Sequence, residues 1–377
     1  DHLNTGLRGI PVGTCRTSFV DPKKGVHYCG YPVGDIAEMD PEDVIFLLYE
    51  KRLPNRQESQ DFRHELAQRA DRLPTGALRV LESLTPASGH PMDWLSIGIQ
   101  ALGLAETTGD VRADGLNLIS RMPELMAAIF RLRGGRGLPD VASEPERGMV
   151  ENFVHLLGME GVDANRMTRT LRVFLVLHMD HGGGNLSTFT GKAVASGWAS
   201  LYASISSAMN ALSGPLHGRA NQSCLEFVQR IGTSDEAEVE SFVRKELAAR
   251  RPIYGFGHAV LRVEDPRAAA QFKLGEEICP DDPNFQTVKT LRVVAPRVLS
   301  ENPKISNPNA NVDIASGTLL NAVGFHKPDY YTRFFGWARV ACISAQILDE
   351  RNARGGRGTP IYRPKYYAED PTIRRLD

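Results

Sequence analysis

The chain lacks an excess of charge of either sign: 44 lysines and arginines stand against 45 aspartates and glutamates, for a formal net charge of −1 at pH 7. No overall field therefore recruits nucleic acid or an anionic membrane surface, and we expect neither as a partner. Long hydrophobic runs are missing too, since no apolar stretch approaches the length of a membrane-spanning helix. The composition, 42% hydrophobic and 24% charged over 377 residues, indicates a globular protein of about two or three domains.

Cysteine is scarce and unpatterned. The five cysteines form no CxxC pair, which fits a reducing compartment and argues against a thiolate zinc site. Cys15 and Cys29 flank a turn-like segment at 21–25, and a disulfide between them across a hairpin has a prior of about one in ten. The sequence leaves this pairing open.

Helical patterns cover most of the chain. The segment 10–33 is the main strand candidate, a hairpin that turns at 22–25. Asp40 and Pro41 supply an N-cap and a first-turn proline for the first helix. Apolar periodicity predicts the other helices at about 57–72, 74–85, 91–104, 115–133, 145–158, 165–181, 218–231, 235–250, 266–278, 285–301, 312–323 and 328–351. The pattern predicts an all-α enzyme.

Two segments lead to more specific expectations. A helix over 165–181 places His178 and His181 three residues apart on one face. The stretch 186–212 is rich in alanine, serine and glycine, which allow close approach between helices. We predict one long central helix there, either at a subunit interface or simply buried.

Histidines beside glycines are the most informative feature of the sequence. His181 precedes three glycines, His217 lies in Gly214-Pro215-Leu216-His217-Gly218, and His258 follows Gly255-Phe256-Gly257. Glycine lets backbone and ligand approach closely, and imidazole exchanges protons near neutral pH. With Asp313 further along the chain, these segments indicate proton-transfer chemistry.

His217 follows Gly214-Pro215 and is expected to open a helix. Main-chain N–H groups at a helix start disfavour an imidazolium, so His217 would stay neutral and could donate a hydrogen bond to a developing enolate. Taken alone, a structural, capped histidine remains the better reading of this position.

Arg267 is a candidate for binding an anion, and Asp313 is a candidate base. Asp265 and Pro266 resemble an N-cap and first helical residue, which puts Arg267 in a first turn where it could clamp a carboxylate. A surface arginine is the alternative. Asp313 lies in a mostly apolar stretch and is a candidate base with a raised pKa, with an N-cap as the equally good alternative.

Two other chemistries fit less well. His181-Gly182-Gly183-Gly184 matches the oxyanion-hole signature of some esterases, but no serine has glycines at both flanking positions of a nucleophile elbow. His178 and His181 have a spacing that can serve a metal, but no third ligand is suggested nearby. We therefore expect no metal site.

Taken together, the motifs resemble the citrate synthase family in their order and approximate spacing. The likeness spans nearly the whole chain, from the Gly6-Leu7-Arg8-Gly9-Ile10 segment to Arg363-Pro364-Lys365. Each motif alone is weak, whereas the ordered set is specific. One departure is that many members carry glutamate at the position of Gly182. The matching motifs are Leu177 to Asn185, Gly214 to Gly218, Gly255 to His258, Asp265-Pro266-Arg267 and Asn311-Val312-Asp313.

The resemblance implies a citrate-synthase-like two-domain helical fold and a homodimer. The large domain would comprise 1–217 and 319–377, and a small domain at 218–318 would close over the active site. Asp313 would remove a proton from acetyl-CoA, His217 would stabilise the enolate, and His258 would polarise the ketone of oxaloacetate. Hydrolysis of the citryl thioester would then release citrate and CoA.

The resemblance also implies the binding residues. Oxaloacetate would be held by His181, Asn185, Arg267, Arg339 and Arg363, with Arg363 reaching the site of the partner subunit. Coenzyme A, a co-substrate rather than a tightly bound cofactor, would meet the Pro252–Gly257 loop and a phosphate-contacting arginine. The residues expected there are Tyr254, Gly255, Phe256, Gly257 and Arg262.

Three alternatives stay open. A 2-methylcitrate synthase would use propionyl-CoA through the same residues, because one methylene is worth only about 1–3 kcal/mol in an apolar pocket. A non-catalytic helical scaffold is the rival of a different class. The expected compartment is the cytoplasm, or the mitochondrial matrix if a leader once preceded Asp1.

Overall fold

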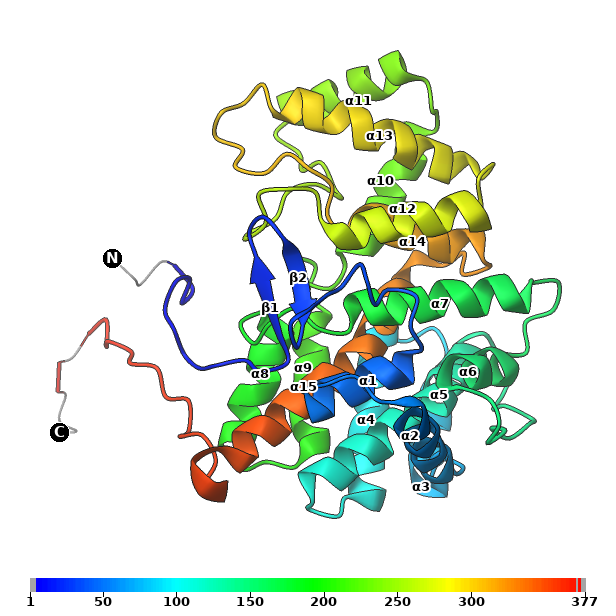
Figure 1. The fold of residues 1–377 in the computed structure, drawn as a ribbon, viewed down its shortest axis with the longest axis vertical. Coiled ribbons are helices and arrows are strands. Elements are labelled where there is room, and N and C mark those ends of the chain that lie inside the picture. The colour runs from blue at the N-terminus through cyan, green and yellow to red at the C-terminus, as the bar shows by residue number, and fades with distance from the viewer. Residues whose placement is uncertain (1–4, 371, 374–377) are drawn as a thin grey trace.

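The computed structural model describes residues 5–370, 372 and 373, and the regular secondary structure within them is almost entirely helical, as predicted (Figure 1). Most helix ends lie within a few residues of the expected ones. The strands are β1 (Ser18–Asp21), β2 (Gly25–Tyr28) and β3 (Tyr31–Pro32). The helices are α1 (Pro41–Glu50), α2 (Arg56–Arg69), α3 (Thr75–Glu82), α4 (Pro91–Glu106), α5 (Val111–Arg133), α6 (Met149–Leu157), α7 (Ala164–His178), α8 (Leu186–Ser196), α9 (Leu201–Leu212), α10 (Ala220–Ile231), α11 (Glu236–Ala248), α12 (Pro266–Ile278), α13 (Pro283–Leu299), α14 (Asp313–Ala322), a 3-10 turn (Pro328–Tyr330) and α15 (Tyr331–Gly356).

The predicted N-terminal hairpin is present. β1 pairs antiparallel with β2, and β3 adds a short third strand to the other edge of β2. The hairpin turn reaches the loop before α12, where the Arg262 N–H donates to the Pro22 carbonyl over 2.8 Å. The turn therefore joins two distant parts of the chain. Cys15 and Cys29 are both free thiols, so the alternative of a disulfide across this hairpin is not realised.

The helices form two groups that meet around α7 and α14 (Figure 1). In one group α11 packs on α13, and α14 packs against α10 and α12. The other group contains α1 to α9 together with α15, whose largely buried length contacts α5, α7, α8 and α9. The first group covers most of the expected small domain at 218–318, whose exact limits remain a prediction.

The long helix expected over 186–212 is two helices. α8 ends at Ser196, Trp198 takes a left-handed conformation with φ +64°, and the Ser200 side chain caps the start of α9. A Cβ on Gly191 would lie 3.2 Å from the Ala208 Cβ, so small residues let α8 and α9 fold back on each other. Close helix approach is confirmed, whereas the single helix was wrong because the reversal at 197–200 has weak local signals.

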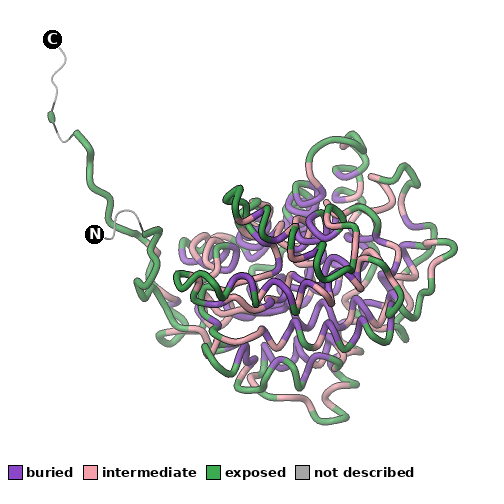
Figure 2. Tube along the Cα trace, turned by 90° about the horizontal axis from the view of Figure 1, so that it is seen from above, coloured by how far each residue is buried: buried purple, intermediate pink, exposed green. Residues whose placement is uncertain are grey.

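The tail after α15 carries no regular secondary structure among its described residues, in line with its Gly-, Arg- and Pro-rich composition. It leads away from the helical body beside the N-terminal segment (Figure 2). No helix of the described residues is long and apolar enough to cross a membrane.

Candidate active site

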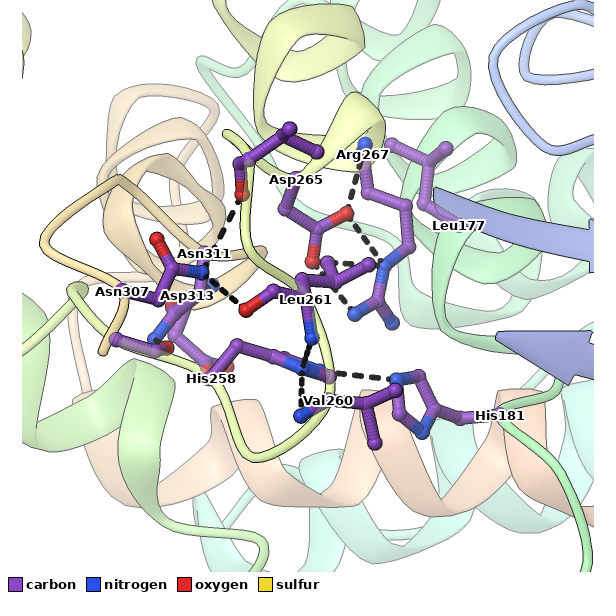
Figure 3. A network of polar contacts seen from close by, with 12 residues as sticks. Leu177, His181, His258, Val260, Leu261, Asp265, Arg267, Asn307, Asn311 and Asp313 are labelled. Atoms are coloured by element: carbon purple, nitrogen blue, oxygen red, sulfur yellow. Dashed lines mark hydrogen bonds and ion pairs between the residues drawn. The ribbon is translucent and has the colours of Figure 1, made fainter. Parts of the chain in front are cut away.

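Main-chain pairing between two distant loops brings the His258 and Asp313 segments together. Figure 3 shows both residues within one network of polar contacts. Gly257 N–H donates to the Asn309 carbonyl over 3.0 Å, and Asn311 N–H donates to the Gly255 carbonyl over 2.9 Å. The Asn311 amide then donates to the Gly257 carbonyl and accepts from the Asp313 N–H, both over 2.9 Å. Asn311 thus fixes the start of α14 against the loop that carries His258.

The loop at 254–257 approaches α14 so closely that only glycine fits at Gly255. Its φ is +84°, and an added Cβ would lie 2.9 Å from the Cα of Ile314 and 3.0 Å from the Cys224 sulfur. Real Cβ atoms do not tolerate such backbone contacts. Gly257 also has a left-handed φ of +82°, but the nearest atom to its added Cβ would be the Asn307 carbonyl oxygen at 3.6 Å. The expected glycine-lined segment therefore exists, with a packing role at Gly255.

Asp313 is the first residue of α14, whose N-cap position is occupied by Val312. The N-cap alternative for Asp313 is therefore wrong. No hydrogen bond joins its carboxylate to another residue in the described part of the chain. Burial raises the pKa of Asp313 to about 6, although the positive charges of Arg267 and Arg339 act in the opposite direction. The predicted rise in pKa is thus present in the structure.

His258 is held in one tautomer by its own loop. Its Nδ1 accepts from the main-chain N–H groups of Val260 and Leu261 over 3.0 and 2.9 Å. The proton of the neutral ring therefore lies on Nε2, which is 3.1 Å from Nε2 of His181 (Figure 3). Burial and then the charge of Arg267 lower the pKa of His258.

His181 follows α7 and is anchored through its neighbour Asp180. The fully buried Asp180 carboxylate accepts from His181 N–H over 2.6 Å, from the Thr17 hydroxyl over 2.5 Å and from the Gln346 amide over 3.2 Å. Asp180 N–H in turn donates to the Tyr28 hydroxyl. Sequence reasoning missed this support, whose only local signal is an aspartate between two histidines.

His178 does not share a face with His181, because α7 ends at His178. Its side chain is fully buried, with Nδ1 2.8 Å from the Phe174 carbonyl and the ring stacked on Phe174. Burial lowers the pKa of His178 to about 3. His178 is therefore a neutral core residue, and the expectation of a shared helical face was wrong.

His217 lies in a turn before α10, so the expectation that it opens a helix was also wrong. Its Nε2 instead accepts from the Ser187 main-chain N–H over 3.1 Å in the first turn of α8. The Asn185 side chain caps α8 by accepting from Thr188 N–H over 3.1 Å. Burial and then Arg339 lower the pKa of His217 to about 4, so the ring is neutral as expected.

Arg267 and Asp265 form a buried ion pair at the start of α12. Asp265 is the N-cap, as predicted, and accepts from both the main chain and the guanidinium of Arg267. The closest contact joins Arg267 Nη2 to Asp265 Oδ2 over 2.7 Å. The surface alternative for Arg267 is wrong, since the residue is only 3% exposed.

Arg339 acts electrostatically on several residues of this site. It lies on α15, is 3% exposed, and its Nε and Nη1 have no hydrogen-bond partner among the described residues. Its charge lowers the pKa values of His181, His217 and Asp313. Its guanidinium also lies 4.9 Å from the centroid of the Phe335 ring. Buried N–H groups without a hydrogen-bond acceptor are costly, which makes this position suited to receive an anion.

The remaining predicted residues have different surroundings. Asn185 donates to the Gly182 carbonyl over 3.0 Å besides capping α8, so its amide is already engaged within the chain. Arg262 donates through Nη1 to main-chain carbonyls of its own loop, and Arg363 is exposed on the tail. Tyr254 and Phe256 are partly buried and pack against the core. Their predicted substrate and CoA contacts stay predictions.

Among the described residues, no group of three or more His, Cys, Asp or Glu side chains is arranged to hold a metal ion. What the site offers is three neutral imidazoles, a carboxylate with a raised pKa, and two buried arginines. Such a set can move a proton on and off carbon while holding an anionic reactant.

Comparison with known proteins gives one consistent family. Residues 6–365 match the family model described as "Citrate synthase, C-terminal domain". The chain is 33% identical to the mitochondrial citrate synthase of Neurospora crassa, covering 99% of this chain and 84% of that protein. It is also 33% identical to the peroxisomal citrate synthase of Saccharomyces cerevisiae, covering 98% and 85% of the two chains.

Solved structures agree in fold. The citrate synthase of Thermotoga maritima superposes with a TM-score of 0.84 at 28% identity, covering 99% of this chain and 98% of that one. The citrate synthase of Thermoplasma acidophilum, solved in a ternary complex with carboxymethyl coenzyme A and oxaloacetate, gives a TM-score of 0.86 at 22% identity. It covers 99% and 98% of the two chains.

Proposed function

The chain belongs to the citrate synthase family, and we propose that His217, His258 and Asp313 carry out its reaction. In that reaction acetyl-CoA condenses with oxaloacetate and water to give citrate and CoA. The observation that supports this assignment most strongly is Arg339, a buried guanidinium whose Nε and Nη1 have no partner among the described residues and whose charge acts on His181, His217 and Asp313.

Asp313 is the base in this proposal. A pKa of about 6 leaves its carboxylate mostly ionised at neutral pH and makes it a stronger base than an ordinary aspartate. Its oxygens are engaged by no other described residue, so a substrate methyl group can approach them. Asp313 takes the proton from the methyl carbon of acetyl-CoA.

His217 stabilises the enolate that forms. The Ser187 main-chain N–H is a fixed donor to Nε2, so the proton of the neutral ring lies on Nδ1 and can be donated to the thioester oxygen. A preorganised donor at a developing negative charge is worth about 3–4 kcal/mol. His217 supplies that donor without carrying a positive charge into the buried site.

His258 activates the second substrate. Its Nε2–H, fixed by the two hydrogen bonds to Nδ1, donates to the ketone oxygen of oxaloacetate. The two carboxylates of oxaloacetate pair with Arg339 and Arg267, with His181 as a further contact and Asn185 nearby. Holding both reactants in attack geometry supplies roughly 7–11 kcal/mol.

Closure of a small domain at 218–318 over a large domain at 1–217 and 319–377 completes the proposal. It excludes water until the carbon–carbon bond has formed and so protects the thioester. The loop with Tyr254, Gly255, Phe256 and Gly257 receives the adenine of CoA, which is released as a co-substrate, and Arg262 receives a phosphate. In a homodimer, Arg363 on the exposed tail reaches the site of the partner subunit.

The compartment is a separate proposal. Relatives are named mitochondrial and peroxisomal, and for this chain we propose the cytoplasm, with the mitochondrial matrix as the alternative. Cell fractionation followed by immunodetection decides between them.

The function is tested by following CoA release with oxaloacetate and either acetyl-CoA or propionyl-CoA. We expect faster turnover with acetyl-CoA, and loss of turnover with retained folding in Asp313→Ala. Faster turnover with propionyl-CoA would make the enzyme a 2-methylcitrate synthase. Full activity of Asp313→Ala would remove the assigned base, and no CoA release from either substrate would contradict the function.

A further inference from the structure

The hydrogen bond between His181 and His258 has a fixed direction. Nδ1 of His258 already accepts from two main-chain N–H groups, so its Nε2 carries the proton and is the donor. Nε2 of His181, 3.1 Å away, must therefore be the acceptor and carry a lone pair. The two rings thus form a hydrogen bond with each other (Figure 3).

A dicarboxylate bound in this site would face the unprotonated Nε2 of His181. Once the His258 proton turns to the ketone of the substrate, Nε2 of His181 presents a lone pair to a carboxylate oxygen, and two acceptors repel. The ring can respond by moving its proton from Nδ1 to Nε2, or by taking up a second proton.

The surrounding charges favour the second response only when the substrate is present. Burial and the nearby guanidiniums of Arg267 and Arg339 lower the pKa of His181 well below its usual value, so the free ring is neutral. A bound dianion brings two negative charges next to the same ring and acts against the effects of burial and of both guanidiniums, because it favours the protonated imidazole. The charged and titratable groups that act on His181 are His258, Arg267, Arg339 and its neighbour Asp180. Asp265 pairs with Arg267, and the Tyr28 hydroxyl accepts from the Asp180 N–H.

We propose that binding of a dicarboxylate breaks the His181–His258 hydrogen bond and transfers one solvent proton to Nε2 of His181, so that substrate binding is linked to proton uptake. The inference rests on the proposed function, since it takes oxaloacetate as the dianion in this site. No covalent bond is made or broken in this step. The proton leaves the buffer and stays on the imidazolium while the carboxylate is bound.

The test is titration calorimetry of oxaloacetate binding to the intact protein at about pH 7.5, in buffers with different ionisation enthalpies. We expect the observed enthalpy to vary with the buffer as for uptake of about one proton, and affinity to weaken up to about tenfold per pH unit at higher pH. His181→Gln keeps an amide donor but cannot titrate, so its uptake should vanish. Asp313→Asn is the matched control and should keep it.

Several outcomes would overturn the inference. Binding without proton uptake in the natural protein would favour a change of tautomer instead. Uptake that persists in His181→Gln but disappears in Asp313→Asn would assign the proton to Asp313. If either of these results were found together with turnover of oxaloacetate, the proposed function would still stand. If oxaloacetate neither bound nor supported CoA release, both the inference and the proposed function would be wrong.

A second measurement needs no variant. Nitrogen-15 spectra of histidine-labelled protein should show an unprotonated Nε2 on His181 before oxaloacetate is added and two protonated ring nitrogens afterwards. A neutral ring in the complex, with its proton moved to Nε2, would contradict the proposal even if His181→Gln failed to fold.

Discussion

Replacement of Asp313 by asparagine should make the protein more stable at neutral pH while it sharply lowers turnover. Burial raises the pKa of Asp313 to about 6, roughly two pH units above an ordinary aspartate. Keeping this carboxylate ionised at neutral pH therefore costs about 3 kcal/mol of folding free energy. Asparagine has nearly the same shape without the charge, and the Asp313 carboxylate accepts no hydrogen bond from the described residues that would be lost.

The contribution of Asp313 to folding stability should depend on pH in a defined direction. Because the pKa of Asp313 is higher in the folded than in the unfolded chain, the protonated carboxyl favours folding. This contribution is complete below about pH 4 and is lost as the pH rises through about 6. The stability gain of Asp313→Asn should thus be near zero at about pH 4 and reach about 3 kcal/mol above pH 7.

Urea unfolding at fixed protein concentration, followed by tryptophan fluorescence, measures the difference at each pH. Turnover should fall by about 10²–10⁴-fold in the same variant, since a positioned base is lost. Asp265→Asn is the matched control: it breaks the buried ion pair with Arg267 and should destabilise the protein by about 3–5 kcal/mol. The reasoning would be refuted if Asp313→Asn were no more stable than the natural protein at neutral pH. It would also be refuted if the gain in the free energy of unfolding were the same at every pH.

Three further outcomes are expected. Arg339→Gln should raise the KM for oxaloacetate at least about 100-fold in steady-state assays without loss of stability, because the guanidinium is buried with unpartnered nitrogens; an unchanged KM would contradict its role. Gly255→Ala should lower stability by more than about 2 kcal/mol and reduce kcat, whereas Gly257→Ala, with its nearest contact at 3.6 Å, should cost less in the same urea assay. Arg363→Leu should be inactive alone but regain CoA release in mixed dimers with Asp313→Asn, since one site then has both residues; no recovery would place Arg363 outside the partner site.

Local signals predicted much of the fold and of the site. The Asp265-Pro266-Arg267 sequence specified an N-cap, a first-turn proline and the position of an arginine within a few residues, and the structure has all three. The hairpin turn and most helix ends depended on similarly short patterns. The raised pKa of Asp313 followed from its apolar surroundings in the sequence.

Contacts between distant segments could not be predicted in the same way. Neutral His217 was expected, but the N–H group that meets it belongs to Ser187 on α8 rather than to the helix that follows it. The reversal between α8 and α9 places Gly191 close to Ala208, a contact that periodicity does not reveal. The support of His181 by Asp180 joins residues from three separate segments, including Thr17 and Gln346.

These contacts explain how charge is distributed among the residues of the site. His181, His217 and His258 all have lowered pKa values, so the positive charge that awaits the substrate resides on Arg267 and Arg339. Arginine cannot give up its proton, which keeps that charge constant while the imidazoles remain free to donate or accept. For Asp313, desolvation outweighs the attraction of both arginines, and its pKa rises instead of falling. Asp313 is therefore a stronger base than an ordinary aspartate even with both guanidiniums nearby.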